Sequence, residues 1–174
     1  MQDSSIEILK IDISDIETLQ SLSIQTFYET YSDRNTPENM EIYVSKNFSS
    51  EKLKKDIEQK DSEIYFALMD KTPVGYLKVN YNDIQTELNY PNSIELERIY
   101  VLKEHQGHKI GQLLFNKALS LGKQKNMNFL WLGVWSQNTK AIHFYEKNGL
   151  KKFRTHLFKL GEDKQLDFLM KIDI

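Results

Sequence analysis

The sequence predicts a mixed α/β (α+β) domain built on one central sheet of about seven mostly antiparallel strands flanked by helices. Its 174 residues are 40% hydrophobic, enough for one core that buries roughly 70% of the surface exposed by the unfolded chain. Strand and helix patterns follow in the order strand, helices, three strands, helix, strand, helix, two strands. No repeat, linker or low-complexity tract divides residues 1–174, so we expect a single domain.

Each predicted element rests on a local pattern. Residues 6–11 alternate partly between apolar and polar, as a half-buried strand does. A capping box at 14–17 begins the first helix, and Thr36-Pro37 and Ser49-Ser50 begin two more. The predicted strands are 6–11, 64–69, 74–79, 94–101, 129–134 and two around the turn at 161–163, and the predicted helices are 16–31, 36–47, one through Leu53 and Ile57, 110–126 and 138–147.

Two further expectations concern the middle of the chain. The polar stretch 80–93 is predicted to be an exposed loop. The strand that follows it has a period of two, which is expected to place Glu95, Glu97, Ile99 and Val101 on one face.

Composition and charge exclude several classes of protein. A formal charge of −2 leaves no basic stripe for a phosphate backbone, so we expect no nucleic-acid partner. The absence of cysteine excludes disulfides, thiolate metal sites and an acyl-cysteine intermediate. No apolar run approaches the roughly 20 residues that cross a bilayer, and the polar start at 1–5 lacks a signal pattern. A cytoplasmic protein without a membrane partner is expected.

The segment 96–111 places a strand, a short turn and the start of a helix in succession. Backbone N–H groups at a helix N-terminus lack internal partners, so a diphosphate can bind there. Glycines at 107 and 111 allow close approach. Alone, this pattern is more often a plain connection, and it matches neither the P-loop nor the dinucleotide-binding motif.

The turn Gln106-Gly107-His108-Lys109-Ile110-Gly111 resembles the Gln/Arg-x-x-Gly-x-Gly/Ala loop of the GCN5-related N-acetyltransferase (GNAT) superfamily, with Lys109 where that family usually has glycine. The resemblance implies a GNAT fold and acetyl-coenzyme A (acetyl-CoA) as co-substrate. It also implies that the preceding strand pairs with the pantetheine arm. The implied cofactor-binding residues are Ile99, Tyr100, Val101, Gln106, Gly107, His108, Lys109, Ile110, Gly111, Asn138 and Tyr145.

A second motif lies at 138–150. It resembles the superfamily pattern Asn-x-x-Ala-x-x-Phe-Tyr-x-x-x-Gly-Phe, with Leu150 as the last residue. Asn138 and Tyr145 lie seven residues apart, about two helical turns, and can address one ligand. Their alternatives are a helix N-cap and a core aromatic. The resemblance, which covers Glu95 to about Leu160, implies that Tyr145 protonates the departing thiolate and that the Val101 N–H stabilises the oxyanion.

An amine must lose a proton before it attacks a thioester, since alkyl amines titrate near pH 10 or so. Glu97 is the candidate catalytic base, with Glu95 one pleat further away. The alternative is that Glu97 pairs with Arg98 or a neighbouring strand as an ordinary charge. The four histidines form no metal-binding pattern, so no metal is expected.

Within the superfamily, the runs at 96–101, 131–135, 158–161 and 26–31 look like those of PaiA-type spermidine/spermine acetyltransferases. This similarity implies a small-molecule amine substrate, most simply a polyamine. Acidic and aromatic side chains of the helical insert, Tyr28, Tyr31 and Glu41, are candidate substrate-binding residues. The alternatives are a protein N-terminal or lysine acetyltransferase and a non-catalytic acyl-CoA sensor. A homodimer is an expectation by family analogy alone.

Overall fold

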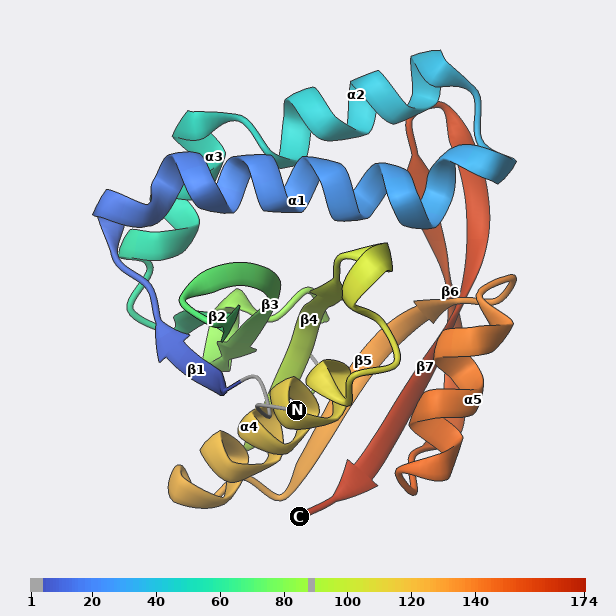
Figure 1. Ribbon diagram of the computed structural model, residues 1–174. Helices are drawn as coiled ribbons and strands as arrows, with labels where there is room; N and C mark the ends of the chain where they lie inside the picture. The colour runs from blue at the N-terminus through green and yellow to red at the C-terminus, as the bar shows by residue number, and fades with distance from the viewer. Residues whose placement is uncertain (1–4, 88–89) are drawn as a thin grey trace.

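The computed structural model describes residues 5–87 and 90–174, which form one seven-stranded sheet in the order β1-β2-β3-β4-β5-β7-β6 (Figure 1). Only the β4–β5 pairing in this part of the chain is parallel, and the other five are antiparallel. The strands are β1 (Ile6–Lys10), β2 (Ser62–Met69), β3 (Thr72–Tyr81), β4 (Ser93–Val101), β5 (Phe129–Trp135), β6 (Lys151–Leu160) and β7 (Asp163–Asp173). The predicted fold class is confirmed.

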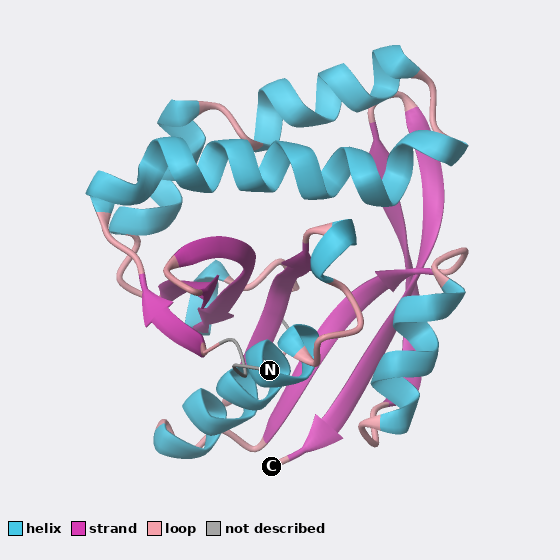
Figure 2. Cartoon of the chain, viewed as in Figure 1, coloured by secondary structure: helices cyan, strands magenta, loops and turns pink. Residues whose placement is uncertain are grey.

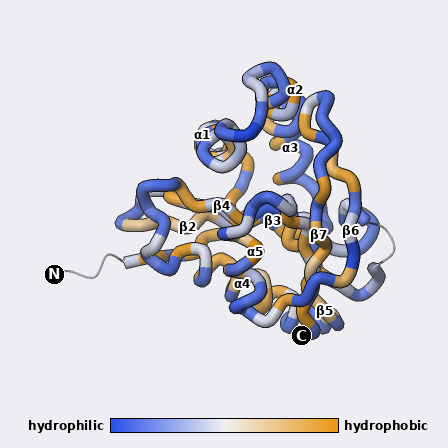
Figure 3. Tube along the Cα trace, turned by 90° about the vertical axis from the view of Figure 1, so that its right-hand side faces the viewer, coloured by the Kyte–Doolittle hydropathy of each residue, from blue (hydrophilic) through white to orange (hydrophobic). Residues whose placement is uncertain are grey.

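Helices cover both faces of the sheet (Figure 2). The helices α1 (Ile16–Tyr31), α2 (Pro37–Asn47) and α3 (Ser50–Glu58) lie on one face, with a core of their own that includes Phe27, Phe48 and Tyr76. The helices α4 (Ile110–Gln124) and α5 (Thr139–Lys147) pack over the other face. The strands between these layers carry much of the hydrophobic colour in Figure 3. Both faces of the sheet are therefore buried over much of its area.

Two of the predicted helix starts are confirmed by their caps, whereas the capping box predicted at 14–17 is wrong: Asp12 and Asp15 form it instead, two residues earlier. The Thr36 side chain accepts a hydrogen bond from the Asn39 N–H at the start of α2, and Pro37 occupies the first turn. The Ser49 side chain caps α3 through the Lys52 N–H. These bonds satisfy N–H groups that the helices leave free, so the boundaries are local properties of the sequence.

The prediction of an exposed loop at 80–93 is wrong for three of its polar residues. Asn80, Gln85 and Ser93 are all buried. The Gln85 Oε1 atom accepts hydrogen bonds from Trp131 Nε1 at 2.7 Å and from Ser93 Oγ at 2.9 Å. Polar side chains with such partners can be buried without a large penalty, which the composition of the segment did not reveal.

The prediction that β4 keeps a strict period of two is also wrong. The register between β3 and β4 shifts next to Lys78, so Glu97 is the extra residue of a β-bulge. Beyond the bulge the faces are exchanged: Tyr100 joins the core beneath α1–α3, and Ile99 and Val101 join the core beneath α4. A bulge that re-aims side chains often lies beside a functional site.

Two expectations fall partly outside the described residues. The polar N-terminal start includes residues 1–4, and the 80–93 loop includes residues 88 and 89.

Candidate functional site

Two cavities meet where β4 and β5 separate. One, the cleft, has a volume of about 740 Å³ and lies between the end of β4, the 106–111 loop and α5. The other, the side cavity, has a volume of about 460 Å³ and lies between β4, β5, β7 and α2. The residues lining both are Tyr31, Leu96, Glu97, Arg98, Tyr100 and Gly133. A molecule in the cleft and one in the side cavity can therefore reach each other at this junction.

The cleft exists because the parallel β4–β5 pairing is short. It joins only 93–95 to 129–131, and beyond these positions the two strands diverge. The Leu102 N–H donates to the Val74 carbonyl on β3 at 2.9 Å. Because N–H groups alternate in direction along a strand, the Val101 N–H faces the opposite way, toward the gap beside β5. An extended ligand arm could pair with β4 there, and an oxyanion could accept that bond.

The 106–111 loop exposes backbone at the N-terminus of α4. Gly107 has φ +89°, and no neighbouring atom lies within 4 Å of the place that a Cβ atom would take there. Lys109, the residue that precedes α4, has φ 62°. Two positive φ angles, separated by one residue at a helix start, turn the backbone so that its N–H groups form a concave nest suited to a phosphate. The Lys140 Nζ atom on α5 donates to Gln106 Oε1 at 2.6 Å, so the cleft is bridged by a cation. This donor set fits a diphosphate.

Asn138 and Tyr145 both line the cleft from α5. The Asn138 side chain accepts from the Ala141 N–H at 3.2 Å, so it is also the N-cap of the helix. Tyr145 is buried, and burial raises its phenol pKa above the ordinary value. Its hydroxyl therefore stays protonated at neutral pH and can donate a proton.

Glu97 sits in a saturated ion network. Its carboxylate accepts from Lys78 Nζ at 2.7 Å and Asn80 Nδ2 at 2.6 Å, and lies 3.4 Å from Arg98. Burial alone would raise the pKa of Glu97, but the charges of Arg98 and Lys78 lower it to about 2. The structure therefore contains the ion-paired Glu97 that the sequence left open as an alternative. A carboxylate held in this way is a weak proton acceptor at neutral pH.

Glu95 is the other acid on this face of β4. It accepts from the Thr86 backbone N–H at 2.9 Å, from the Thr86 hydroxyl and from Asn80 Nδ2 at 3.0 Å. Burial, followed by the charge of Glu97, raises the pKa of Glu95. Donors of the 80–93 segment already occupy the lone pairs of Glu95. Its carboxylate can therefore add negative charge to the side cavity, but it has no oxygen free for a further hydrogen bond.

Of the other substrate-binding and cofactor-binding residues predicted from the sequence, most line a cavity and three do not. Tyr31 lines both cavities, and its hydroxyl lies 3.3 Å from the Tyr100 hydroxyl. Tyr28 and Glu41 are exposed and line neither cavity, because each follows a buried helical residue and points about 100° away from it. The side chain of His108 also lies outside the cleft lining and contacts the His105 carbonyl. The other predicted cofactor-binding residues line the cleft.

Sequence reasoning missed Asp167 and His156, which line the side cavity from β7 and β6. One signal was present: Asp167 is a lone charge within the apolar run 166–170. Only the β5–β7 register, which pairs it with Trp135, shows that it belongs to the site.

Two kinds of feature are absent from the described residues. Among residues 5–87 and 90–174, no group of three or more His, Cys, Asp or Glu side chains is placed to hold a metal ion. No helix in that same part of the chain is long and apolar enough to span a bilayer.

Comparison with known proteins places these features in context. The model of the acetyltransferase (GNAT) family matches residues 18–150. An uncharacterized N-acetyltransferase of Lactobacillus delbrueckii subsp. lactis is 37% identical over 168 residues, 97% of each chain. The spermidine N(1)-acetyltransferase of Thermoplasma acidophilum is 31% identical over 171 residues, 96% of each chain. The crystal structure of the PaiA N-acetyltransferase of Thermoplasma acidophilum in complex with coenzyme A has a TM-score of 0.81 and 29% identity, covering 98% of this chain and 99% of that one.

Proposed function

The chain belongs to the acetyltransferase (GNAT) family, and we propose that it moves an acetyl group from acetyl-CoA to a polyamine such as spermidine or spermine. Its activity as an acetyl-CoA-dependent N-acetyltransferase follows from the family. The polyamine is the part we add. The spermidine acetyltransferase that matches it along 96% of its length supports this choice.

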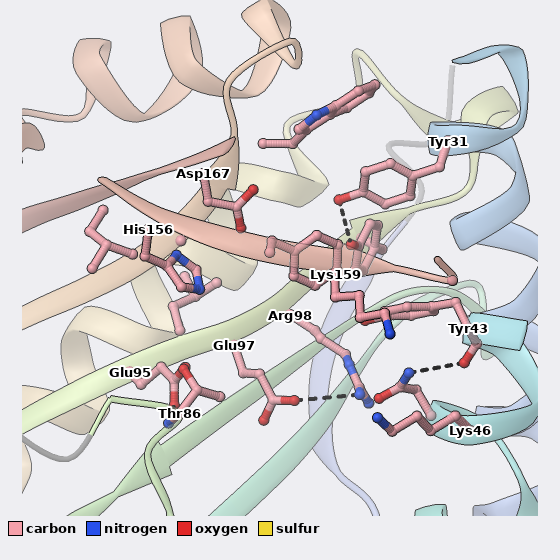
Figure 4. Close-up of a pocket in the computed structure, with 18 of the residues that line it drawn as sticks. Tyr31, Tyr43, Lys46, Thr86, Glu95, Glu97, Arg98, His156, Lys159 and Asp167 are labelled. Carbon is pink, nitrogen blue, oxygen red and sulfur yellow. Dashed lines mark hydrogen bonds and ion pairs between the residues drawn. The ribbon is translucent and has the colours of Figure 1, made fainter. Parts of the chain in front are cut away.

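The observation that carries the proposal is the side cavity (Figure 4). Carboxylates line it, together with the rings of Tyr31, Tyr43 and Trp135. Acidic groups bind ammonium charges, and aromatic faces attract them. Three cationic side chains also line the side cavity, Arg98, Lys46 and Lys159. Arg98 is paired with Glu97 and Asp56, and Lys159 lies 3.6 Å from Glu162, which leaves Asp167 as the carboxylate placed to hold a cationic ligand.

The side cavity also has a roof that disfavours a folded protein as acceptor. The β6–β7 turn is fastened to α2, because Asn39 Oδ1 accepts from the Glu162 N–H at 3.0 Å (Figure 1). Gln165 donates to Asn35 at 2.7 Å, and the Tyr43 and Phe158 rings lie 5.8 Å apart. A slender linear amine fits beneath such a roof more easily than a peptide attached to a protein surface.

In the proposed reaction the amine attacks acetyl-CoA directly in a ternary complex. Acetyl-CoA supplies an activated thioester carbonyl. The N–H groups of 106–111 bind its diphosphate, and the free edge of β4 binds its pantetheine arm. The Val101 N–H stabilises the carbonyl oxygen as negative charge develops, and Tyr145 gives its proton to the sulfur.

The test is a thiol-release assay with acetyl-CoA and a panel of spermidine, spermine, propylamine, free lysine and a peptide with a free N-terminus. We expect the highest kcat/KM with spermidine or spermine. Equal or faster turnover of the peptide would reject the polyamine and favour a protein acetyltransferase. Binding of acetyl-CoA without release of thiol for any amine would favour a non-catalytic sensor. Tyr145→Phe, run in parallel, controls for contaminating acetyltransferase activity.

A further inference from the structure

Asp167 occupies the middle of β7 at the inner wall of the side cavity. It pairs with Trp135 on β5 and with His156 on β6. Figure 4 shows its carboxylate between His156 and Tyr31, on the opposite side of the side cavity from Glu95 and Glu97. It lies outside residues 18–150, so the family pattern assigns it no role.

The glycine at position 133 leaves open space between Asp167 and the junction of the two cavities. Gly133 precedes Trp135 by two residues on β5 and therefore lies on the same face. A Cβ atom at Gly133 would lie 3.6 Å from Asp167 Oδ2. Gly133 lines both the cleft and the side cavity. The Asp167 carboxylate thus stands directly beside the position where the two ligands meet.

The Asp167 carboxylate is short of hydrogen-bond donors. Its Oδ1 atom is buried and has no hydrogen-bond partner among the described residues. Leaving such an oxygen without a donor is costly, and an ammonium ion in the side cavity would supply one. Glu97, in contrast, has Lys78, Asn80 and Arg98 around it.

The surroundings of Asp167 also set its titration. Burial raises the pKa of Asp167 to about 6, and the charge of His156 on β6 opposes this shift. The other titratable groups that line the side cavity are Tyr31 on α1, Tyr43 and Lys46 on α2, Glu95, Glu97 and Arg98 on β4, and Lys159 and Glu162 at the end of β6. Among these, Glu97 pairs with Arg98 and Glu162 with Lys159. Such a group is ionised at neutral pH yet more basic than an ordinary aspartate, as general bases require.

We propose that Asp167 is the general base that accepts the proton of the acceptor amine. The ammonium donates one proton to the Asp167 carboxylate, and the freed lone pair forms the C–N bond to the acetyl carbon. The C–S bond breaks, its electron pair leaves on sulfur, and the sulfur takes the Tyr145 proton. The second nitrogen proton restores Tyr145 through solvent, and Asp167 releases its own proton to solvent. The inference requires acetyl transfer to an amine but not that the amine is a polyamine.

The test compares wild type, Asp167→Asn and Glu97→Gln over a pH range with acetyl-CoA and the fastest amine of the panel. We expect the wild-type kcat/KM to fall on the acid side of about pH 6. Asp167→Asn should lose this limb and about 100-fold or more of kcat/KM at neutral pH. The loss should shrink near pH 10 or so, where the amine arrives neutral. Glu97→Gln should keep the acid limb.

A second measurement does not depend on any acceptor. With carboxyl-13C aspartate, the wild type should show one signal that titrates near pH 6 and is absent from Asp167→Asn. If another amine of the panel is acetylated and the polyamines are not, the proposed polyamine substrate fails, and this titration still decides whether Asp167 has the protonation that the inference requires. An Asp167 signal that titrates below about pH 5, or an acid limb that persists in Asp167→Asn, overturns the role of Asp167.

Discussion

Replacing Lys109 by glycine should stabilise the protein. Lys109 has φ 62°, and the left-handed conformation costs an L-residue roughly 1–2 kcal/mol relative to its usual regions. Glycine avoids this cost but loses about 0.4–1 kcal/mol through the greater freedom of its unfolded chain. The net expectation for Lys109→Gly is a gain of about 0.5–1 kcal/mol in the free energy of unfolding, or roughly 1–4 °C in Tm for a chain of this size.

The matched control is Lys109→Ala, which removes the same charge and keeps the strained backbone. Urea unfolding should place Lys109→Gly above Lys109→Ala by that margin. Gly107→Ala provides the reverse change, because Gly107 has φ +89° and its added methyl would meet no atom within 4 Å; its stability should fall by about 1 kcal/mol from backbone strain alone. Equal stability of Lys109→Gly and Lys109→Ala would refute the reasoning.

Four further changes test the site. Tyr145→Phe should lower kcat by about 100-fold or more while calorimetry finds acetyl-CoA affinity little changed; unchanged turnover removes Tyr145 as the acid. Lys78→Met should cost about 3–5 kcal/mol in urea unfolding because it strands buried carboxylates, whereas Lys55→Met in an exposed pair should leave stability unaltered. Gly133→Ala should fold normally yet raise the amine KM, since its methyl fills the junction; an unaltered KM contradicts that path. The pKa of Asp167 rises from 3.8 to about 6 on folding, so wild-type stability should fall as pH rises between these values. Asp167→Asn should have a shallower slope, since Glu95, whose pKa burial also raises, still contributes. The variant should be more stable by about 1–2 kcal/mol at neutral pH, after allowance for solvent screening, and an unchanged slope would assign it to another group.

The sequence allowed the elements, their order and the cleft motif to be predicted because these depend on local signals. The side chains of Thr36 and Ser49 begin helices by accepting hydrogen bonds from backbone N–H groups three residues later. Gly107 favours a turn whatever tertiary structure surrounds it. The bulge at Glu97 depends instead on the register of β3 against β4. No pattern within β4 reveals it, and so the strict alternation of faces was wrong beyond that residue.

The same distinction explains why the side cavity was harder to predict than the cleft. The cleft is built from two contiguous motifs, whereas the side cavity is assembled from α1, α2, β4, β5, β6 and β7. Tyr28 and Glu41 were plausible by residue type, but the helical period turns them outward. The pairing of Asp167 with Trp135 spans 32 residues of sequence (167 − 135), and only the completed sheet brings that carboxylate to Gly133.

The placement of Asp167 connects the stability of the fold with its chemistry. Asp167 is a desolvated carboxylate on β7, the strand next to the edge of the sheet, and one of its oxygens has no donor among the described residues, so it destabilises the folded state at neutral pH. An apolar residue at this position would carry no such penalty, so the acid is explained by what it does when a cation enters the side cavity. Ligand binding should then relieve the same penalty. A cationic amine should raise Tm more in wild type than in Asp167→Asn, because the variant has no carboxylate at this position. Equal Tm shifts in the two proteins would mean that the ammonium group binds elsewhere, at Glu95 or Glu162. Asp167 would then not be placed to accept the proton of the amine.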